Sequence, residues 1–133
     1  MKKFELLEFP KFSDQKGTLV PFEFSDIPFP VKRVYLVTGK ENVPRGQHAH
    51  IIEDELFVAV SGSILVKVND GSGDTEILLD SPNVGLLVRK DCWHELHNFA
   101  ENTIVMAFSS TEYLPGAGNY IMDKEEFLKN CEK

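Results

Sequence analysis

The sequence predicts an all-β protein, a sandwich or barrel of short strands with one short helix at the C-terminus. Two observations favour this fold class. Short runs with apolar and polar residues in alternation recur along the chain, as in the run Ile64–Asn69, and turn-forming residues separate them. A chain of 133 residues that is 42% hydrophobic can also bury a core unaided, so we expect one domain spanning residues 1–133.

The alternation places the expected strands in order along the chain. They are Phe4–Phe9, Thr18–Phe24, Val31–Thr38, Glu55–Val60, Ile64–Asn69, Thr75–Leu79, Gly85–Arg89, Trp93–Phe99 and Thr103–Ser109. Turns are expected at Asp70-Gly71, at 81–83, at 100–102 and at 115–119. Asp123 followed by Glu126 resembles a capping box, which predicts a helix that ends near Lys133 and docks through Phe127 and Leu128.

Charge and cysteine content exclude several classes of protein. The chain has 14 Lys and Arg against 21 Asp and Glu, a net charge of −7, whereas a nucleic-acid-binding protein has a basic surface. The same balance argues against a membrane-surface role, and we find no apolar run of the roughly 18 residues that a membrane span needs. Glu5 and Glu8 interrupt the N-terminal apolar run, so we do not expect this run to act as a signal peptide. Cys92 and Cys131 form no metal or disulfide pattern, and we expect a cytoplasmic location.

The histidines and the few arginines point to a site. The four His occur as two close pairs, 48/50 and 94/97. In an extended chain His48 and His50 share a face, and so do Arg33 and Tyr35. A cation and a phenol facing a closed core would each need a partner, whereas both are expected on the wall of a ligand cavity. Arg45 directly precedes the first His pair.

Structural roles compete with functional ones at several of these positions. A lone strand His is usually part of the scaffold, which is the role we expect for His97, while His94 is the candidate from the second pair. Tyr35 could also close the edge of a cavity through its hydroxyl. For Trp93, core and cavity wall remain alternatives.

The spacing His48-x-His50-x4-Glu55-x6-Gly62 resembles the first motif of the cupin superfamily. Two imidazoles and a carboxylate are a common ligand set for transition metals. The second cupin motif matches poorly, since Leu96 occupies the position of its His. A metal-dependent cupin that uses His48, His50 and Glu55, either an oxygenase or a metal-assisted isomerase, is therefore one alternative.

A closer resemblance covers residues 14–127. The runs KRVY, RG and HAH, then SGS, LDSP, GLLV and WHELHNF, and finally a Tyr-rich tail, are similar to those of the sugar 3,4-ketoisomerases. This resemblance implies a cupin jelly roll (double-stranded β-helix) that forms a homodimer and needs no metal or other cofactor. It implies dTDP-4-oxo-6-deoxyglucose as the substrate, in the biosynthesis of deoxyamino sugars for surface polysaccharides.

The resemblance also assigns residues. It implies His48 as the catalytic base, with His50 and Tyr35 as further catalytic residues and Arg45 in the site. We expect the substrate to be bound by Arg33, Arg45, Lys16, His94, Trp93 and Glu55. The chain departs from the family at Asp54-Glu55, where Glu-Gln is common, and at Lys16, which replaces an Arg. Alternatives are a 3,5-epimerase of the same substrate and a sugar-binding cupin without catalytic activity.

Overall fold

The computed structural model describes residues 2–113 and 117–132. Most of the assigned elements are strands, and the expected all-β class is confirmed. The strands are β1 (Phe4–Glu8), β2 (Phe12–Asp14), β3 (Gly17–Leu19), β4 (Arg33–Val37), β5 (Arg45–His50), β6 (Glu55–Ser61), β7 (Ile64–Asn69), β8 (Asp74–Leu79), β9 (Val84–Val88), β10 (Trp93–His97), β11 (Ile104–Ser109) and β12 (Tyr120–Ile121). The helices are η1 (Phe24–Asp26), η2 (Ala117–Asn119) and α1 (Lys124–Cys131).

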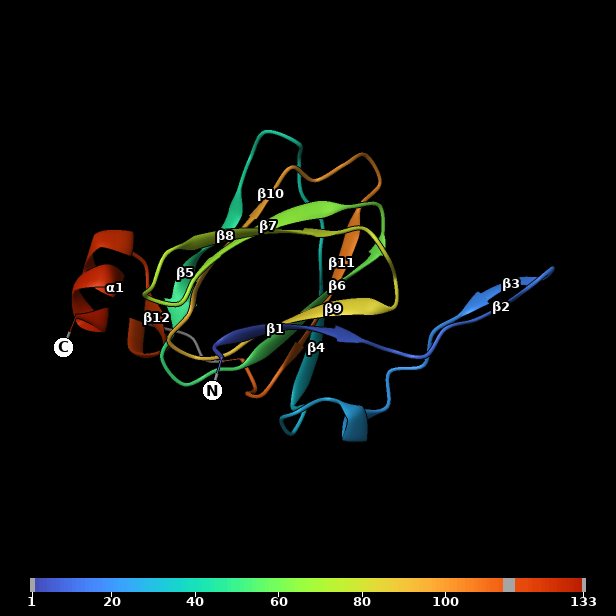
Figure 1. Cartoon of the computed structure of the whole chain (residues 1–133), viewed down its shortest axis with the longest axis horizontal. Helices are drawn as coiled ribbons and strands as arrows, with labels where there is room; N and C mark the ends of the chain where they lie inside the picture. Colours follow the sequence, from blue (N-terminus) through green and yellow to red (C-terminus); the bar gives the residue numbers. More distant parts are fainter. Residues whose placement is uncertain (1, 114–116, 133) are drawn as a thin grey trace.

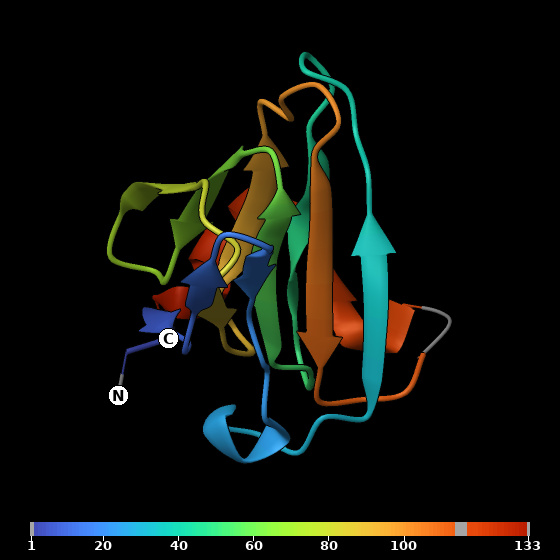
Figure 2. The ribbon, with the colours of Figure 1, turned by 90° about the vertical axis from the view of Figure 1, so that its right-hand side faces the viewer.

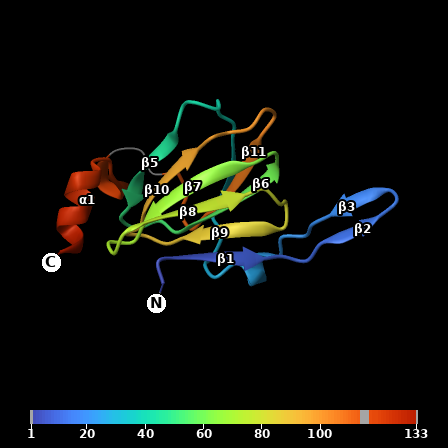
Figure 3. The same cartoon turned by 45° about the horizontal axis from the view of Figure 1, so that its top comes forward.

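Two five-stranded antiparallel sheets form a sandwich (Figure 1). The first sheet has the order β1-β9-β6-β11-β4, and the second has the order β12-β5-β10-β7-β8. Figure 2 shows β4 beside β11 at one edge of the first sheet, and Figure 3 shows β1 along β9 at the other edge and β7 between β8 and β10. Neighbours in each sheet are often distant in the chain, so residues from four separate segments can meet between the sheets.

Strand β6 is buried on both faces. Phe57 and Ala59 point into the core between the sheets, while Leu56 and Val58 pack on the outer side against apolar residues of the N-terminal segment, such as Ile27. This explains why the sequence from Leu56 to Val60 is a continuous apolar run instead of an alternating one. Glu55, on the same face as Phe57, therefore carries a carboxylate into the interior.

Helix α1 packs against the outer face of the second sheet at β5 and β10. The Asp123 carboxylate accepts a hydrogen bond from the backbone N–H of Glu125 and caps the helix, as its position in the sequence predicts. Phe127 is buried against Ala49 and Trp93. Within the described residues, no helix is long and apolar enough to cross a membrane.

Some expected elements differ from the structure. Thr18–Phe24 is not one strand, because β3 ends at Leu19 shortly before Pro21, whose ring nitrogen cannot donate a hydrogen bond. Strands β2 and β3 instead form a hairpin that projects from the sandwich (Figure 1). Strands β5 and β12 are present in addition to the expected strands. Pro115 and Gly116 of the expected turn at 115–119 lie outside the described residues.

Candidate active site

Strand β5 directs both of its histidine side chains into the space between the sheets. His48 and His50 point inward, while Ala49 packs outward against Trp93. The pairing of β5 with β10 is irregular between His48↔His94 and Arg45↔Leu96, and Gly46 adopts a positive φ of 63°. A bulge of this kind re-aims neighbouring side chains, which explains how Arg45 reaches the rim of the same cavity.

Two adjoining hollows meet at His48 and Tyr35. One is lined by Tyr35, Val37, Arg45, Gly46, His48, Phe57, His94 and Leu96. The other is lined by Arg33, Tyr35, His48, His50, Glu53, Tyr113 and Tyr120. Residues from both sheets line each hollow. Most of the site residues expected from the sequence lie in these two hollows. His48 is accessible from both hollows.

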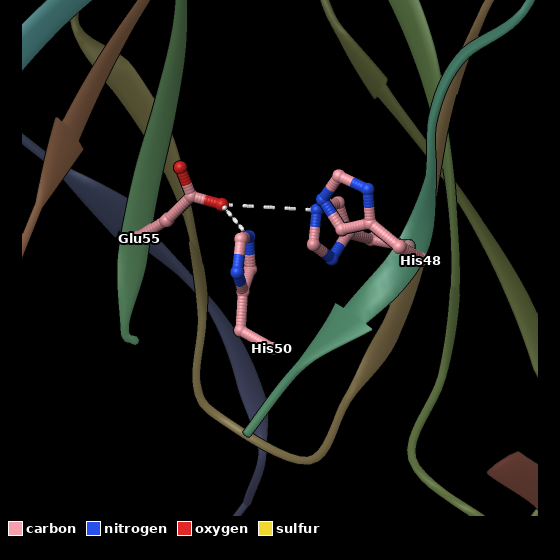
Figure 4. A group of neighbouring side chains, drawn as sticks. His48, His50 and Glu55 are labelled. Carbon is pink, nitrogen blue, oxygen red and sulfur yellow. Dashed lines mark ion pairs between the residues drawn. The ribbon is translucent and has the colours of Figure 1, made fainter. Parts of the chain in front are cut away.

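The innermost part of the site is a cluster of three imidazoles and one carboxylate. Figure 4 shows His48, His50 and Glu55 pointing toward one another from β5 and β6. The His50 Nε2 atom lies 2.6 Å from Oε1 of Glu55, and His94 Nε2 lies 3.8 Å from the same oxygen. The His48 ring centroid is 4.7 Å from that of His50 and 4.8 Å from that of His94.

Burial shifts the protonation equilibria of this cluster. Burial, and then the neighbouring His50, lowers the pKa of His48 to about 4. The pKa of His94 is lowered well below its usual value, again by burial first and then by His48 and His50. Burial raises the pKa of Glu55 by more than the close contact with His50 and the hydrogen bond from Tyr35 lower it. His48 and His94 are therefore neutral at pH 7.

Tyr35 is held in the cavity by its phenol group. The hydroxyl donates a hydrogen bond to Oε2 of Glu55. Burial raises the pKa of Tyr35, and the nearby Glu55 carboxylate raises it further. The hydroxyl therefore stays protonated at any physiological pH and acts as a donor.

A second buried carboxylate, Glu53, organises the outer part of the site. It accepts hydrogen bonds from Arg33 Nη2 at 3.0 Å, Ser109 Oγ at 2.8 Å, Thr111 Oγ1 at 3.1 Å and Asn119 Nδ2 at 2.9 Å. Burial alone would raise the pKa of Glu53, but His50 and the hydrogen bonds lower it below the usual value. The ion pair fixes Arg33, whose guanidinium carbon lies 5.1 Å from the centroid of the Tyr35 ring.

Two of the expected substrate-binding residues lie elsewhere. Trp93 is on the outer face of β10, where it packs on Phe127 and donates its indole N–H to Glu95, so the cavity-wall alternative for Trp93 is wrong. The physical reason is the two-residue period of a strand, which directs Trp93 away when its neighbour His94 points inward. Lys16 is at the tip of the projecting β2–β3 hairpin, away from the imidazole cluster of the same chain (Figure 1).

Other residues of the site were absent from the sequence-based candidates. Glu53, Asn119 and Tyr120 all lie outside the strands that the periodicity predicted. The Tyr120 ring is 5.0 Å from that of His48, and Asn119 hydrogen-bonds both Glu53 and His50. Tyr120 belongs to the Tyr-rich tail that forms part of the resemblance to the ketoisomerases, and this tail is the sequence signal for it. His97 pairs with Glu95 on the outer face, as a scaffold residue would.

Comparison with known proteins places the chain among relatives. The family described as WxcM-like, C-terminal (FdtA) matches residues 2–132. The chain belongs to this family. It is 38% identical over 131 residues, 97% of the chain and 93% of the relative, to a TDP-4-oxo-6-deoxy-α-D-glucose-3,4-oxoisomerase from Aneurinibacillus thermoaerophilus.

Solved structures agree with this family membership. A 3,4-ketoisomerase from Helicobacter canadensis superposes with a TM-score of 0.90 at 32% identity over 100% of both chains. WlaRB, a TDP-quinovose 3,4-ketoisomerase from Campylobacter jejuni, gives a TM-score of 0.88 at 33% identity over 98% of this chain and 100% of that one. The expected cupin jelly roll and the resemblance to the ketoisomerases are thereby confirmed.

Proposed function

We propose that the chain is a sugar-nucleotide 3,4-ketoisomerase that converts TDP-4-oxo-6-deoxyglucose into a 3-oxo isomer. The observation that carries this proposal is a neutral imidazole, His48, exposed to a cavity whose walls hold further donors. Among the described residues no hydrogen bond engages the His48 ring, so its lone pair is free for a substrate. The activity of the relative that is 38% identical supports the same reaction.

The reaction is an intramolecular shift of a carbonyl group. In our proposal His48 takes the proton from C3, the C3–H electron pair forms a C3–C4 double bond, and the C4 carbonyl electrons move onto O4. The O3 proton is then transferred to O4, and the enediolate, now charged on O3, receives at C4 the proton held by His48 or one from solvent, so that C3 becomes the carbonyl carbon and C4 carries a hydroxyl group. Atoms and electrons balance without an external oxidant or reductant.

Fixed donors in the cavity would stabilise the enediolate. We assign this role to Tyr35 and His50, which lie on either side of Glu55 and are joined to it by a hydrogen bond and a short polar contact. The chain Tyr35–Glu55–His50 also offers a route for moving protons between O3, O4 and C4. His94, fully buried behind His48, holds the inner wall.

The nucleotide diphosphate needs positive charge at the rim. Arg45 is exposed at the cavity edge and, within the described residues, makes no ion pair. We assign the principal diphosphate contact to Arg45, because a free guanidinium can bind phosphate oxygens in a bidentate manner. Arg33 offers a second contact at the other hollow, although Glu53 already neutralises part of its charge.

Isomerisation in deuterated buffer tests the reaction. Incubation with TDP-4-oxo-6-deoxyglucose is expected to give a 3-oxo product that carries deuterium at C4, read by NMR. His48→Asn should lower the rate about 10²- to 10⁴-fold, the usual contribution of a general base. His97→Asn, a change of the same type on the outer face, should leave the rate near wild type. Sugar nucleotide binding without solvent exchange would instead indicate a non-catalytic cupin.

We further propose that the protein is a homodimer. The projecting β2–β3 hairpin exposes Phe12 and Leu19, each more than 60% accessible, and β1 and β4 are open sheet edges with exposed Leu6 and Leu36. Exposed apolar side chains and open edges favour association with a second copy. In a dimer Lys16, at the hairpin tip, would contact the second subunit. Light scattering should give twice the monomer mass, and Phe12→Asp with Leu19→Asp should shift the protein toward monomer.

A further inference from the structure

The hollow lined by His48, Tyr35 and Phe57 has two unlike walls. The first sheet contributes Tyr35 and Val37 from β4 and Phe57 from β6, and these side chains are apolar apart from the Tyr35 hydroxyl. The second sheet contributes the imidazole of His48 and, fully buried, that of His94. A sugar ring that enters this hollow therefore has imidazole on one side and mostly carbon on the other.

The polar groups on the first-sheet side are already engaged. The Tyr35 hydroxyl donates its hydrogen to Oε2 of Glu55, which is 1% exposed. Arg33 pairs with Glu53 at 3.0 Å, and Glu53 also accepts hydrogen bonds from three further side chains. The hydroxyl on this wall thus directs its proton toward Glu55 and away from a bound sugar.

His48 is the free group on the second-sheet side. Its ring lines both hollows, and within the described part of the chain no hydrogen bond engages it. His94 instead directs Nδ1 to the backbone carbonyl of Cys92 at 3.4 Å and is 1% exposed. Tyr120, whose ring centroid lies 5.0 Å from that of His48, belongs to the same sheet. Proton exchange with a bound sugar is therefore expected from one side of the cavity.

The configuration of the proposed substrate fixes the side on which the base must lie. In a 4-oxo sugar of gluco configuration, the hydrogen on C3 lies on the same face of the ring as the hydrogen on C5. A base that removes it approaches from this face, so His48 lies there and the wall of Tyr35, Val37 and Phe57 covers the opposite face. The enediolate is planar at C3 and C4. The face that then receives the proton at C4 decides which of two C4 epimers forms.

The first-sheet wall is also a poor place for a proton-donating water. Phe57 is part of the apolar core between the sheets, and Val37 packs against that core. A water molecule held in a cavity needs two or more polar partners. With the Tyr35 hydroxyl engaged by Glu55, this wall does not supply them.

We propose that His48 carries out both proton transfers on one face of the sugar, so that the product has the axial C4 hydroxyl of the galacto configuration. This rests on the proposed function. His48 takes the C3 proton as the C3–H electron pair forms the C3–C4 double bond, and the imidazolium then returns a proton to the neighbouring carbon C4. The O3 proton has moved to O4, the electron pair left on O3 forms the new carbonyl, and the imidazole is neutral again. A proton delivered from the first-sheet wall would instead give the equatorial hydroxyl of the gluco configuration.

The C4 configuration of the first product tests this inference. Wild-type protein is incubated with TDP-4-oxo-6-deoxyglucose, and borodeuteride is added within the first few turnovers. It reduces the ketones before they epimerise in solution, and it marks with deuterium the carbon that carried the ketone. In the product labelled at C3, proton NMR should show the small coupling of an equatorial H4 to an axial H5. A large trans-diaxial coupling would overturn the inference and leave 3,4-isomerisation standing.

A pair of exchange reactions tests whether one group serves both carbons. In deuterated buffer the wild-type protein should exchange H3 of the 4-oxo sugar and H4 of the isolated 3-oxo isomer. His48→Asn should slow both exchanges about 10²- to 10⁴-fold, the usual contribution of a general base. His97→Asn is the matched control and should slow neither, because His97 pairs with Glu95 on the outer face. Near-ultraviolet circular dichroism establishes that each variant is folded.

Two further results separate this inference from the proposed function. A folded His48→Asn protein that loses H3 exchange but keeps H4 exchange would show that another group reaches C4, which overturns the inference alone. A wild-type protein that binds the sugar nucleotide but never forms a 3-oxo isomer would refute the proposed function, and this inference with it.

Discussion

Removing the charge of Glu53 is a sharp test of how the site is held together. Glu53 is 1% exposed and accepts from four donors, two at each carboxylate oxygen. In Glu53→Gln one oxygen becomes an NH₂ group, so two of these hydrogen bonds are lost and two donors face a donor. A hydrogen bond to a charged group is worth roughly 1.5–3 kcal/mol, and loss of one partner of a buried ion pair about 3–5 kcal/mol. Because Arg33 is 22% exposed and keeps some hydration, we expect a net loss of about 2–4 kcal/mol.

Urea unfolding followed by the fluorescence of Trp93, the single tryptophan, measures this loss. With a slope of about 2 kcal/mol per molar urea, a loss of about 3 kcal/mol moves the midpoint by about 1.5 M. Glu76→Gln is the matched control, since its ion pair with Lys67 is exposed and 3.7 Å long and should contribute almost nothing. A midpoint for Glu53→Gln within error of that of Glu76→Gln would refute the reasoning.

The same variant has a predicted pH dependence. The pKa of Glu53 in the folded protein is lower than its reference value of 4.5. Ionised Glu53 therefore contributes stability that is present above pH 4.5 and is lost as the pH falls through the folded-state value. The difference in unfolding free energy between wild type and Glu53→Gln should shrink below pH 4.5. A constant difference down to the acid transition would contradict this sign.

Three further predictions concern the base, the rim and a turn. Because the pKa of His48 is about 4, kcat/KM should stay flat from pH 7 to pH 5.5, whereas a limb near pH 6.5 in a stopped assay would contradict the assignment. Arg45→Ala should raise the KM for the sugar nucleotide about 10- to 100-fold, the loss of one charge-assisted contact, with a much smaller change in kcat; a change in kcat alone would argue against a diphosphate contact. Gly62→Ala should lower the free energy of unfolding by about 2 kcal/mol or more, because Gly62 has a φ of 75° and an added Cβ would lie 2.8 Å from the Thr103 Cα. An unchanged midpoint in urea would contradict this prediction.

Strand period and residue spacing predicted the centre of the site. His48 and His50 share a face because β5 is extended, and the spacing to Glu55 brings a carboxylate from the next strand to the same point. Periodicity did not tell which face of β10 is the inner one, so Trp93 and His94 were both proposed as substrate ligands. Only the packing of Phe127 on Trp93 decides that question.

The remaining differences arise where polar residues occupy positions without a regular pattern. Strand β5 reads Arg-Gly-Gln-His-Ala-His, a polar run that lacks the alternation of a buried strand. Glu53 and Asn119 lie in connecting segments, and long-range pairing alone brings them to His50. The hairpin that carries Lys16 projects from the sandwich, and its apolar residues Phe12 and Leu19 pair with each other and are exposed, a position that strand periodicity does not predict.

The opposing sheets contribute different reacting groups: Tyr35 and Glu55 belong to the first sheet, and His48 and His94 to the second. The distance between the two sheets therefore sets the width of the active-site cavity. The apolar side chains packed between the sheets determine that distance. Trimming a core side chain such as Leu86, which lies on β9 opposite Phe57 of β6, should let the sheets relax toward each other. Turnover would then change along with stability, so substitutions deep in the core offer evolution a way to retune catalysis while every polar residue stays in place.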